Sequence, residues 1–227
     1  MRRRNHSLAK FAVPSVVVAI TALLLTGAAE APPVEDEAPA ISISPEARGV
    51  TQAVTAAELA AWGRRRQDAG ALVMAARLLA EVPVRQNGEE AALFSPLSLL
   101  DEAAAMAPDN PGLIDAVERL RDPLLRGVQS SPFGAGPVFT VKQLRARENW
   151  SFQVEARGNE VLRVAAIGDG DTNIDLTVTD ARGEVVCRDR FGDHYPVCTV
   201  APRQSGAMRV DVVNRGDLWT KVQVLSN

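Results

Sequence analysis

Histidine is scarce in this sequence, with two residues in 227, His6 and His194. His6 precedes an N-terminal apolar run, so His194 is the candidate general base that a Ser-His-Asp hydrolase would need. No Gly-x-Ser-x-Gly nucleophile motif accompanies it. Phosphate-binding glycine loops and dinucleotide fingerprints are also absent from the sequence. The sequence therefore predicts a protein that is not an enzyme, and a cryptic hydrolase acting on an extracellular substrate is the alternative.

An excess of positive charge is lacking as well. The formal net charge is −3, and loss of residues 1–31, which hold four basic residues and one acidic residue, would change it to −6. Binding to a phosphate backbone depends on lysine and arginine, so nucleic acid is not an expected partner. The local basic cluster Arg64, Arg65 and Arg66 occupies three adjacent positions that fan around a helix, which favours a solvated face.

The N-terminal segment has the pattern of an export signal. A basic stretch over residues 2–10 precedes an uncharged apolar run over residues 11–29. This order is typical of a secretory signal, and it predicts a signal peptide over residues 1–31. The mature protein is then expected in the periplasm or the medium, with no membrane association. The alternative is an uncleaved anchor, since the run approaches the roughly 20 residues that span a bilayer.

Composition divides the remaining chain into four segments. Residues 32–50 are rich in proline and acidic residues and are expected to form a disordered linker. Residues 51–128 are rich in alanine and leucine and are expected to form a helical domain. Residues 129–137, rich in glycine, proline and serine, are expected to link it to a β domain over residues 138–227. The fold class predicted is α+β, with about four helices in N-terminal hairpins followed by an all-β sandwich.

Capping signals indicate where the helices start. Thr55 and Glu58 have the spacing of a capping box, which predicts a helix start at Thr55. Further N-caps are expected at Asp68, Ser95 and Asn110, the last two followed by proline. The resulting helix pairs resemble tetratricopeptide-type hairpins, which bind peptides or neighbouring subunits. A plain helical hairpin layer is favoured over that resemblance, because two copies do not align at the 34-residue period of the family.

The second half of the chain consists of short runs of β-forming residues separated by turn residues, which is typical of a sandwich. In one run, Ile174, Leu176 and Val178 alternate with polar residues, so Asp175 is expected to face solvent. The expected strands are residues 138–144, 150–155, 161–167, 174–179, 184–188, 197–200, 208–213 and 218–225.

Several motifs together resemble the bacterial pre-peptidase C-terminal domain. They are the acidic turn with its strand (168–180), the two cysteine segments (183–187 and 198–202), the strand with its asparagine-glycine turn (206–216), and the closing Ser226 and Asn227. The resemblance covers roughly residues 138–227 and implies a jelly-roll sandwich. Members of this family occur at the ends of secreted proteins, often peptidases, and some bind calcium or an extracellular polymer.

The sequence departs from the family pattern at three positions. Thr177 and Trp219 stand where tyrosines are common, and Asn173 replaces a usual aspartate. With the export signal, the resemblance predicts a binding, structural or secretion-stabilising module whose partner is a protein or an extracellular polymer. A calcium-dependent accessory domain is a further alternative.

Two cysteines, Cys187 and Cys198, are present in the chain. An even pair in an exported protein is typically a disulfide, which is the pairing expected here. Zinc is the alternative, with His194 as the nitrogen donor that the mature chain would offer.

Four side chains of the acidic turn have the composition of a calcium site. Asp169, Asp171, Asn173 and Asp175 supply the hard oxygen ligands that calcium prefers. An EF-hand is excluded, because Ile174 occupies the position of its glycine and strands flank the loop. The remaining interpretations are a calcium site at the sandwich edge, or a solvated turn whose aspartates accept hydrogen bonds from backbone N–H groups.

Overall fold

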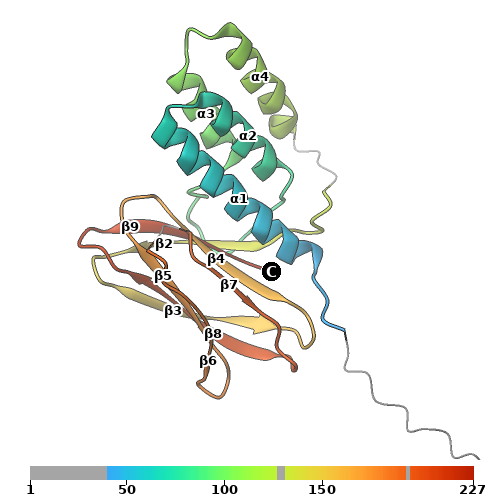
Figure 1. The fold of residues 1–227 in the computed structure, drawn as a ribbon. Helices are drawn as coiled ribbons and strands as arrows, with labels where there is room; N and C mark the ends of the chain where they lie inside the picture. Colours follow the sequence, from blue (N-terminus) through green and yellow to red (C-terminus); the bar gives the residue numbers. More distant parts are fainter. Residues whose placement is uncertain (1–39, 127–130, 193–194) are drawn as a thin grey trace, which may run out of the picture. The chain divides into compact units, whose positions relative to one another are not determined.

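The structure is a computed structural model that describes residues 40–126, 131–192 and 195–227. The predicted signal peptide and the first part of the predicted linker lie outside the described residues. Within them, four helices precede a β-sandwich (Figure 1). The helices are α1 (Pro45–Arg66), α2 (Ala69–Ala80), α3 (Pro96–Met106) and α4 (Pro111–Arg126). The strands are β1 (Arg85–Gln86), β2 (Val138–Leu144), β3 (Asn149–Ala156), β4 (Leu162–Gly168), β5 (Ile174–Thr179), β6 (Val185–Asp189), β7 (Val197–Val200), β8 (Gly206–Asn214) and β9 (Thr220–Ser226).

Three of the predicted helix starts are confirmed by their capping bonds. The side chains of Asp68 and Ser95 accept hydrogen bonds from backbone N–H groups three residues further on. Asn110 does the same at the start of α4, where its Oδ1 lies 3.1 Å from the backbone nitrogen of Leu113. These caps satisfy N–H groups that have no partner within the helix, which is why the short polar residues mark the boundaries correctly.

The helix start predicted at Thr55 is wrong, because α1 already begins at Pro45, within the segment expected to be a linker. Ser44 is the N-cap, and proline at the first helical position needs no hydrogen-bond partner for its nitrogen. The helix then continues across Gly49, where an added Cβ would lie 3.1 Å from Cδ of Pro137. The glycine thus permits a close approach between α1 and Pro137, which composition alone does not reveal.

The strands form two sheets in jelly-roll order. One sheet has the order β1-β2-β9-β4-β7 and the other β3-β8-β5-β6. We leave out the two-residue β1 and number the other eight strands from one to eight in chain order. One sheet then has the order 1-8-3-6 and the other 2-7-4-5, which is the arrangement of a double-sheet jelly roll. The predicted α+β class with a jelly-roll-like sandwich is therefore confirmed. The short strand β1, which pairs in parallel with β2, was not predicted.

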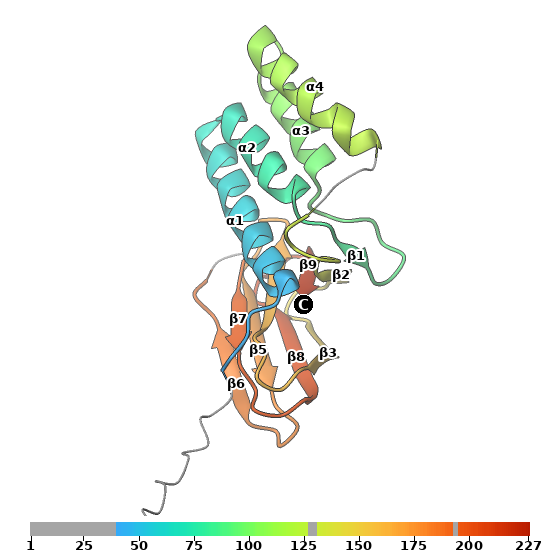
Figure 2. The same cartoon turned by 90° about the vertical axis from the view of Figure 1, so that its right-hand side faces the viewer.

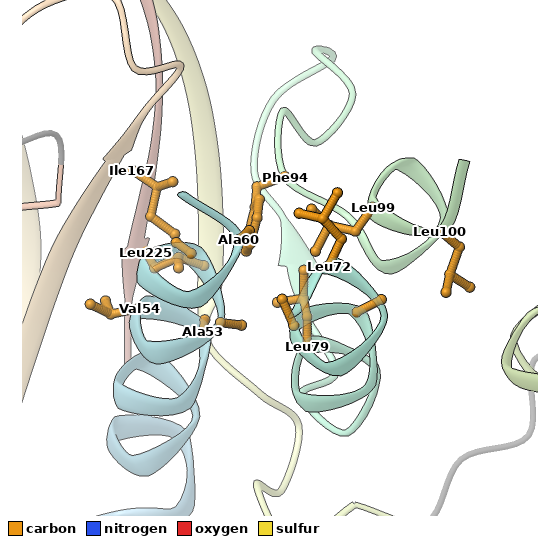
Figure 3. Close-up of a cluster of buried hydrophobic side chains, with 14 of the residues drawn as sticks. Ala53, Val54, Ala60, Leu72, Leu79, Phe94, Leu99, Leu100, Ile167 and Leu225 are labelled. Atoms are coloured by element: carbon orange, nitrogen blue, oxygen red, sulfur yellow. The ribbon is translucent and has the colours of Figure 1, made fainter. Parts of the chain in front are cut away.

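Strand β4 is buried on both faces. Its Ala165 and Ile167 belong, with Leu225 of β9, to a hydrophobic cluster that includes residues of the helices (Figure 3). Val164 and Ala166 of the same strand belong to the cluster between the two sheets. Successive side chains of a strand point to opposite faces, so the five-stranded sheet packs on helices with one face and on the other sheet with its second face. In both views α4 lies farthest from the strands (Figures 1 and 2).

Hydrogen bonds add to this helix–sheet contact. Arg163 Nη1 on β4 donates to the carbonyl oxygen of Ala47 on α1 at 3.1 Å. The backbone N–H of Phe94 donates to Oε1 of the buried Gln223 on β9, also at 3.1 Å. Residues Pro39–Asn227 form one compact unit, and a domain boundary at 129–137 stays a prediction. None of the helices in the described ranges combines the length and apolar character needed to cross a membrane.

Candidate binding surface

Four connections between strands meet at one end of the sandwich. We call residues 145–148, 169–173, 190–192 and 215–219 of these connections the loop face. Backbone hydrogen bonds join three of them: Arg147 N–H donates to Gly216 O at 3.3 Å, and Arg215 N–H donates to Asn173 O at 2.9 Å. Gly216 packs so closely that an added Cβ would lie 2.5 Å from the Thr172 side chain. The predicted acidic turn is therefore one part of a larger surface.

Asn214, at the end of β8, organises the connection to β9. Its side chain is fully buried, and its Nδ2 donates to the carbonyl oxygens of Arg145 at 2.9 Å and Leu218 at 2.6 Å. Its Oδ1 accepts a hydrogen bond from the Gly216 N–H at 2.9 Å. An asparagine that bonds to the backbone two residues further on is a known turn device, so the Asn-x-Gly spacing was the signal in the sequence. Sequence reasoning treated residues 214–217 only as a turn and missed this role.

Asp169 holds the other end of the same connection. Its Oδ1 accepts a hydrogen bond from the Thr220 hydroxyl at 2.6 Å, and its Oδ2 accepts one from the backbone N–H of Lys221 at 2.9 Å. Arg147 adds an exposed ion pair to Asp217, with its Nε and Nη2 at 3.0 and 2.7 Å from Oδ1. Exposed pairs contribute little to stability, so the buried and backbone bonds are the main restraints on this loop.

Asp175 does not face solvent as predicted. Its side chain is only 5% exposed, and its Oδ2 lies 2.6 Å from Nε of Arg215 and 3.3 Å from Nε of Arg190. The alternation in β5 correctly placed Asp175 on the face opposite Leu176, but arginines from two other connections cover it. A carboxylate removed from water requires such partners, because an unpaired buried charge is strongly unfavourable.

Two of the four predicted calcium ligands are therefore engaged in other interactions. Asp169 and Asp175 are engaged as described, while Asp171 is exposed and its backbone N–H bonds to Asp169 Oδ1 at 3.3 Å. Asn173 lies directly before β5, and its Oδ1 is buried without a hydrogen-bond partner. Among the residues that the structure describes, no group of three or more His, Cys, Asp or Glu side chains is arranged to hold a metal ion. Calcium binding stays a prediction without support from this geometry.

The restrained connection presents two large apolar side chains to solvent. Leu218 is 64% exposed and Trp219 is 54% exposed. Leu218 was predicted to begin the last strand, but β9 begins at Thr220, so both side chains lie in the loop. Phe191, in another connection of the loop face, is also exposed. Exposed aromatic and aliphatic side chains on a rigid loop are typical of a binding surface.

The predicted disulfide between Cys187 and Cys198 is confirmed. It joins β6 of one sheet to β7 of the other, with the Cα atoms 5.7 Å apart, and Cys198 is buried between the sheets. Both cysteines are thereby used, so zinc has no thiolate ligands here. His194, the candidate general base, lies outside the described residues.

The basic cluster on α1 is partly engaged within the protein. Arg64 forms a two-bond pair with Glu102 of α3, at 2.8 and 2.7 Å. The hydrogen bond to Glu102 is the main cause that raises the pKa of the Arg64 guanidinium above its ordinary value. The guanidinium of Arg66 lies 5.8 Å from the ring centre of Trp62, within cation–π range. Only part of the cluster therefore has the solvated character that was expected.

Comparison with known proteins gives no family. Neither a model of a known protein family nor a curated protein matches the chain. Among solved structures, the Aeromonas hydrophila periplasmic inhibitor of g-type lysozyme, PliG, is 17% identical, with 44% of this chain and 93% of that chain covered and a TM-score of 0.31. A carbohydrate-binding module of Cellvibrio mixtus lichenase 5A, in complex with cellotriose, is 10% identical, with 39% and 86% covered and a TM-score of 0.27. A de novo designed double-stranded β-helix is 15% identical, with 39% and 97% covered and a TM-score of 0.26. At these TM-scores the matches carry no argument about function.

Asn214 provides a first test of how the loop face is held. Replacing it by alanine removes the three hydrogen bonds of this buried side chain, each of which contributes about 1 kcal/mol. The free energy of unfolding is therefore expected to fall by about 3 kcal/mol, measured by urea denaturation. Asn149→Ala, at an exposed asparagine of β3, is the matched control and is expected to change it by less than about 0.5 kcal/mol. Equal stabilities of the two variants would show that Asn214 does not restrain the loop.

Proposed function

We propose that this chain is an exported, non-catalytic binding protein that contacts its partner through the loop face. The observation that carries the proposal is the exposure of Leu218 and Trp219 on a connection held by Asn214 and Asp169. Because the backbone of this connection is already ordered, binding does not have to order the loop, and this arrangement favours affinity. Tryptophan is among the residues that most often dominate binding energy at interfaces.

Two further observations support export to the periplasm or the medium. The N-terminal charge and apolar pattern is that of a secretory signal. The disulfide between Cys187 and Cys198 is of the kind that persists in oxidising compartments. The jelly-roll strand order is also the one implied by the resemblance to the pre-peptidase C-terminal domain, which supports assigning residues 138–227 to that type of module. The partner is a protein or an extracellular polymer.

The proposal is tested by removing the exposed apolar pair. The full chain is immobilised and titrated with a cell-envelope extract, and the half-saturation concentration is read by biolayer interferometry. Leu218→Ala combined with Trp219→Ala is expected to raise that concentration at least about 30-fold, the effect of losing a hot spot of about 2 kcal/mol.

The matched control is Val185→Ala combined with Val186→Ala, which removes two exposed apolar side chains from β6, away from the loop face. This control is expected to bind like the unchanged protein, and urea denaturation of both variants verifies that they are folded. The proposal fails if the loop-face variant binds as well as the control.

A further inference from the structure

A second concave surface runs along one flank of α1, remote in sequence from the loop face. It consists of two adjoining hollows of about 460 and 330 Å³ that share Thr51, Thr55 and Arg163. We call it the α1–β7 groove. Opposite α1, the smaller hollow is lined by side chains of β4 and β7, and the larger one by Arg163 of β4, Leu78 of α2 and Phe133. Its apolar contributors include Ile43, which is half exposed, and Val197 of β7.

The length of the groove suits a short extended chain. Thr51, Thr55 and Glu58 lie at helical spacings of four and three residues, so they share one face of α1. From Arg48 to Glu58 the helix rises about 15 Å. An extended peptide covers this distance with about five residues.

The charges of the groove differ between its two ends. At one end, Arg48 bonds only to the carbonyl oxygen of Ile43, at 3.1 Å, and Arg163 bonds to uncharged oxygens of α1 and of Thr199. Neither guanidinium has a carboxylate partner among the described residues. At the other end, Glu58 likewise has no ion-pair partner among the residues that the structure describes. The groove is therefore complementary to an occupant that is acidic at one end and basic at the other.

The groove also offers the hydrogen-bonding groups that a peptide backbone requires. The hydroxyl of Thr199 accepts a hydrogen bond from Arg163 Nε at 3.2 Å and keeps its own proton for donation. On β7, the N–H of Val197 donates to Asp189 Oδ2 at 2.9 Å and so points away from β4. The backbone of Thr199, two residues on, points to the same side and lies at the open edge of the five-stranded sheet. An acyl chain would use none of these groups.

We propose that the α1–β7 groove binds an extended peptide segment of about five residues. Its acidic side chain pairs with Arg48 and Arg163, its apolar centre lies over Val197, and its basic side chain pairs with Glu58. This surface is separate from the loop face, so each site can be tested without the other.

The test uses synthetic pentapeptides and the full chain. A peptide array keeps glutamate at one end and lysine at the other and varies the three central positions among valine, isoleucine, leucine and threonine. The strongest sequence is then labelled with fluorescein and titrated by fluorescence anisotropy. Replacing its glutamate by glutamine is expected to weaken binding about fivefold, the effect of one solvent-accessible ion pair.

Variants of the chain locate the binding. Arg48→Gln is expected to weaken binding about fivefold, whereas Arg65→Gln, at an exposed arginine of the same helix outside the groove, leaves it unchanged. Thr55→Tyr fills the groove from an exposed position without touching the core and is expected to abolish binding. Arg65→Tyr is its control. The loop-face variant Leu218→Ala with Trp219→Ala is expected to bind the peptide normally, so failure of one site is distinguishable from failure of the other.

Three outcomes would overturn the inference. One is the absence of binding by any array peptide at millimolar concentration. Another is binding that Thr55→Tyr leaves intact. The third is that no peptide binds, whereas the fatty acid laurate binds and Thr55→Tyr abolishes the binding of laurate. That result would assign the groove to an acyl ligand.

Discussion

Replacing Leu225 by alanine is expected to lower the free energy of unfolding by about 3 kcal/mol and to destabilise the helices and the sandwich together. Leu225 is buried on β9, in the cluster that joins the sheet to α1 (Figure 3). Its removal leaves a cavity bordered by both halves of the protein, and the cost of a cavity adds to the loss of buried apolar surface. Urea denaturation measures the effect with two probes, circular dichroism at 222 nm for the helices and the fluorescence of Trp150 for the sandwich.

The Trp150 signal is isolated by replacing Trp62 and Trp219 with phenylalanine. Leu125→Ala, at an exposed leucine of α4, is the matched control and is expected to change the free energy of unfolding by less than about 0.5 kcal/mol. Coincident transitions for the two probes are expected before and after the Leu225 substitution. Separate transitions would instead show that the halves fold independently, as the domain boundary predicted at residues 129–137 implies.

Reduction of the Cys187–Cys198 disulfide is expected to lower the free energy of unfolding by about 3 kcal/mol. The two cysteines are 11 residues apart in the sequence, so the bond closes a short loop in the unfolded chain and restricts its conformations. In the folded protein it joins strands of opposite sheets, and Cys198 lies in the core. Urea denaturation with and without a phosphine reductant measures the difference, and thiol titration verifies that two thiols are released.

A variant with both Cys187→Ala and Cys198→Ala is the control for the reductant. Its unfolding is expected to be insensitive to reduction and close to that of the reduced protein. If complete reduction leaves the urea midpoint of the unchanged protein in place, the disulfide does not stabilise this fold, and its value as a sign of export is weakened.

Local patterns in the sequence predicted most of the secondary structure. The strands 138–144, 174–179 and 197–200 have the predicted bounds, and the other long strands differ by one or two residues at their ends. Strand alternation and turn residues act over a few positions, so they can be recognised without the tertiary structure. The N-caps at Asp68, Ser95 and Asn110 were recognised for the same reason.

The candidate sites were less predictable. The sequence left two interpretations of the acidic turn, a calcium site and a solvated turn whose aspartates bind backbone N–H groups. It did not reveal that Asp169 and Asp175 bind Thr220 and Arg215. These partners lie about 40 to 50 residues further along the chain and arrive only when β8 and β9 pair with their neighbours. Similarly, the apolar run over residues 164–167 of β4 was a signal that both faces of this strand are covered, but it did not indicate which elements cover them.

The sequence by itself determined the class of fold, the positions of the strands, the pairing of the two cysteines and the export pattern. Each of these depends on composition or on spacing within one segment. The tertiary structure alone decided that Asp175 is buried under two arginines, that Leu218 and Trp219 are held at the surface by Asn214, and that α1 and β7 enclose a groove. The physical reason is that burial and solvent exposure depend on which distant segments pack together, and residue spacing within one segment carries no information about that packing.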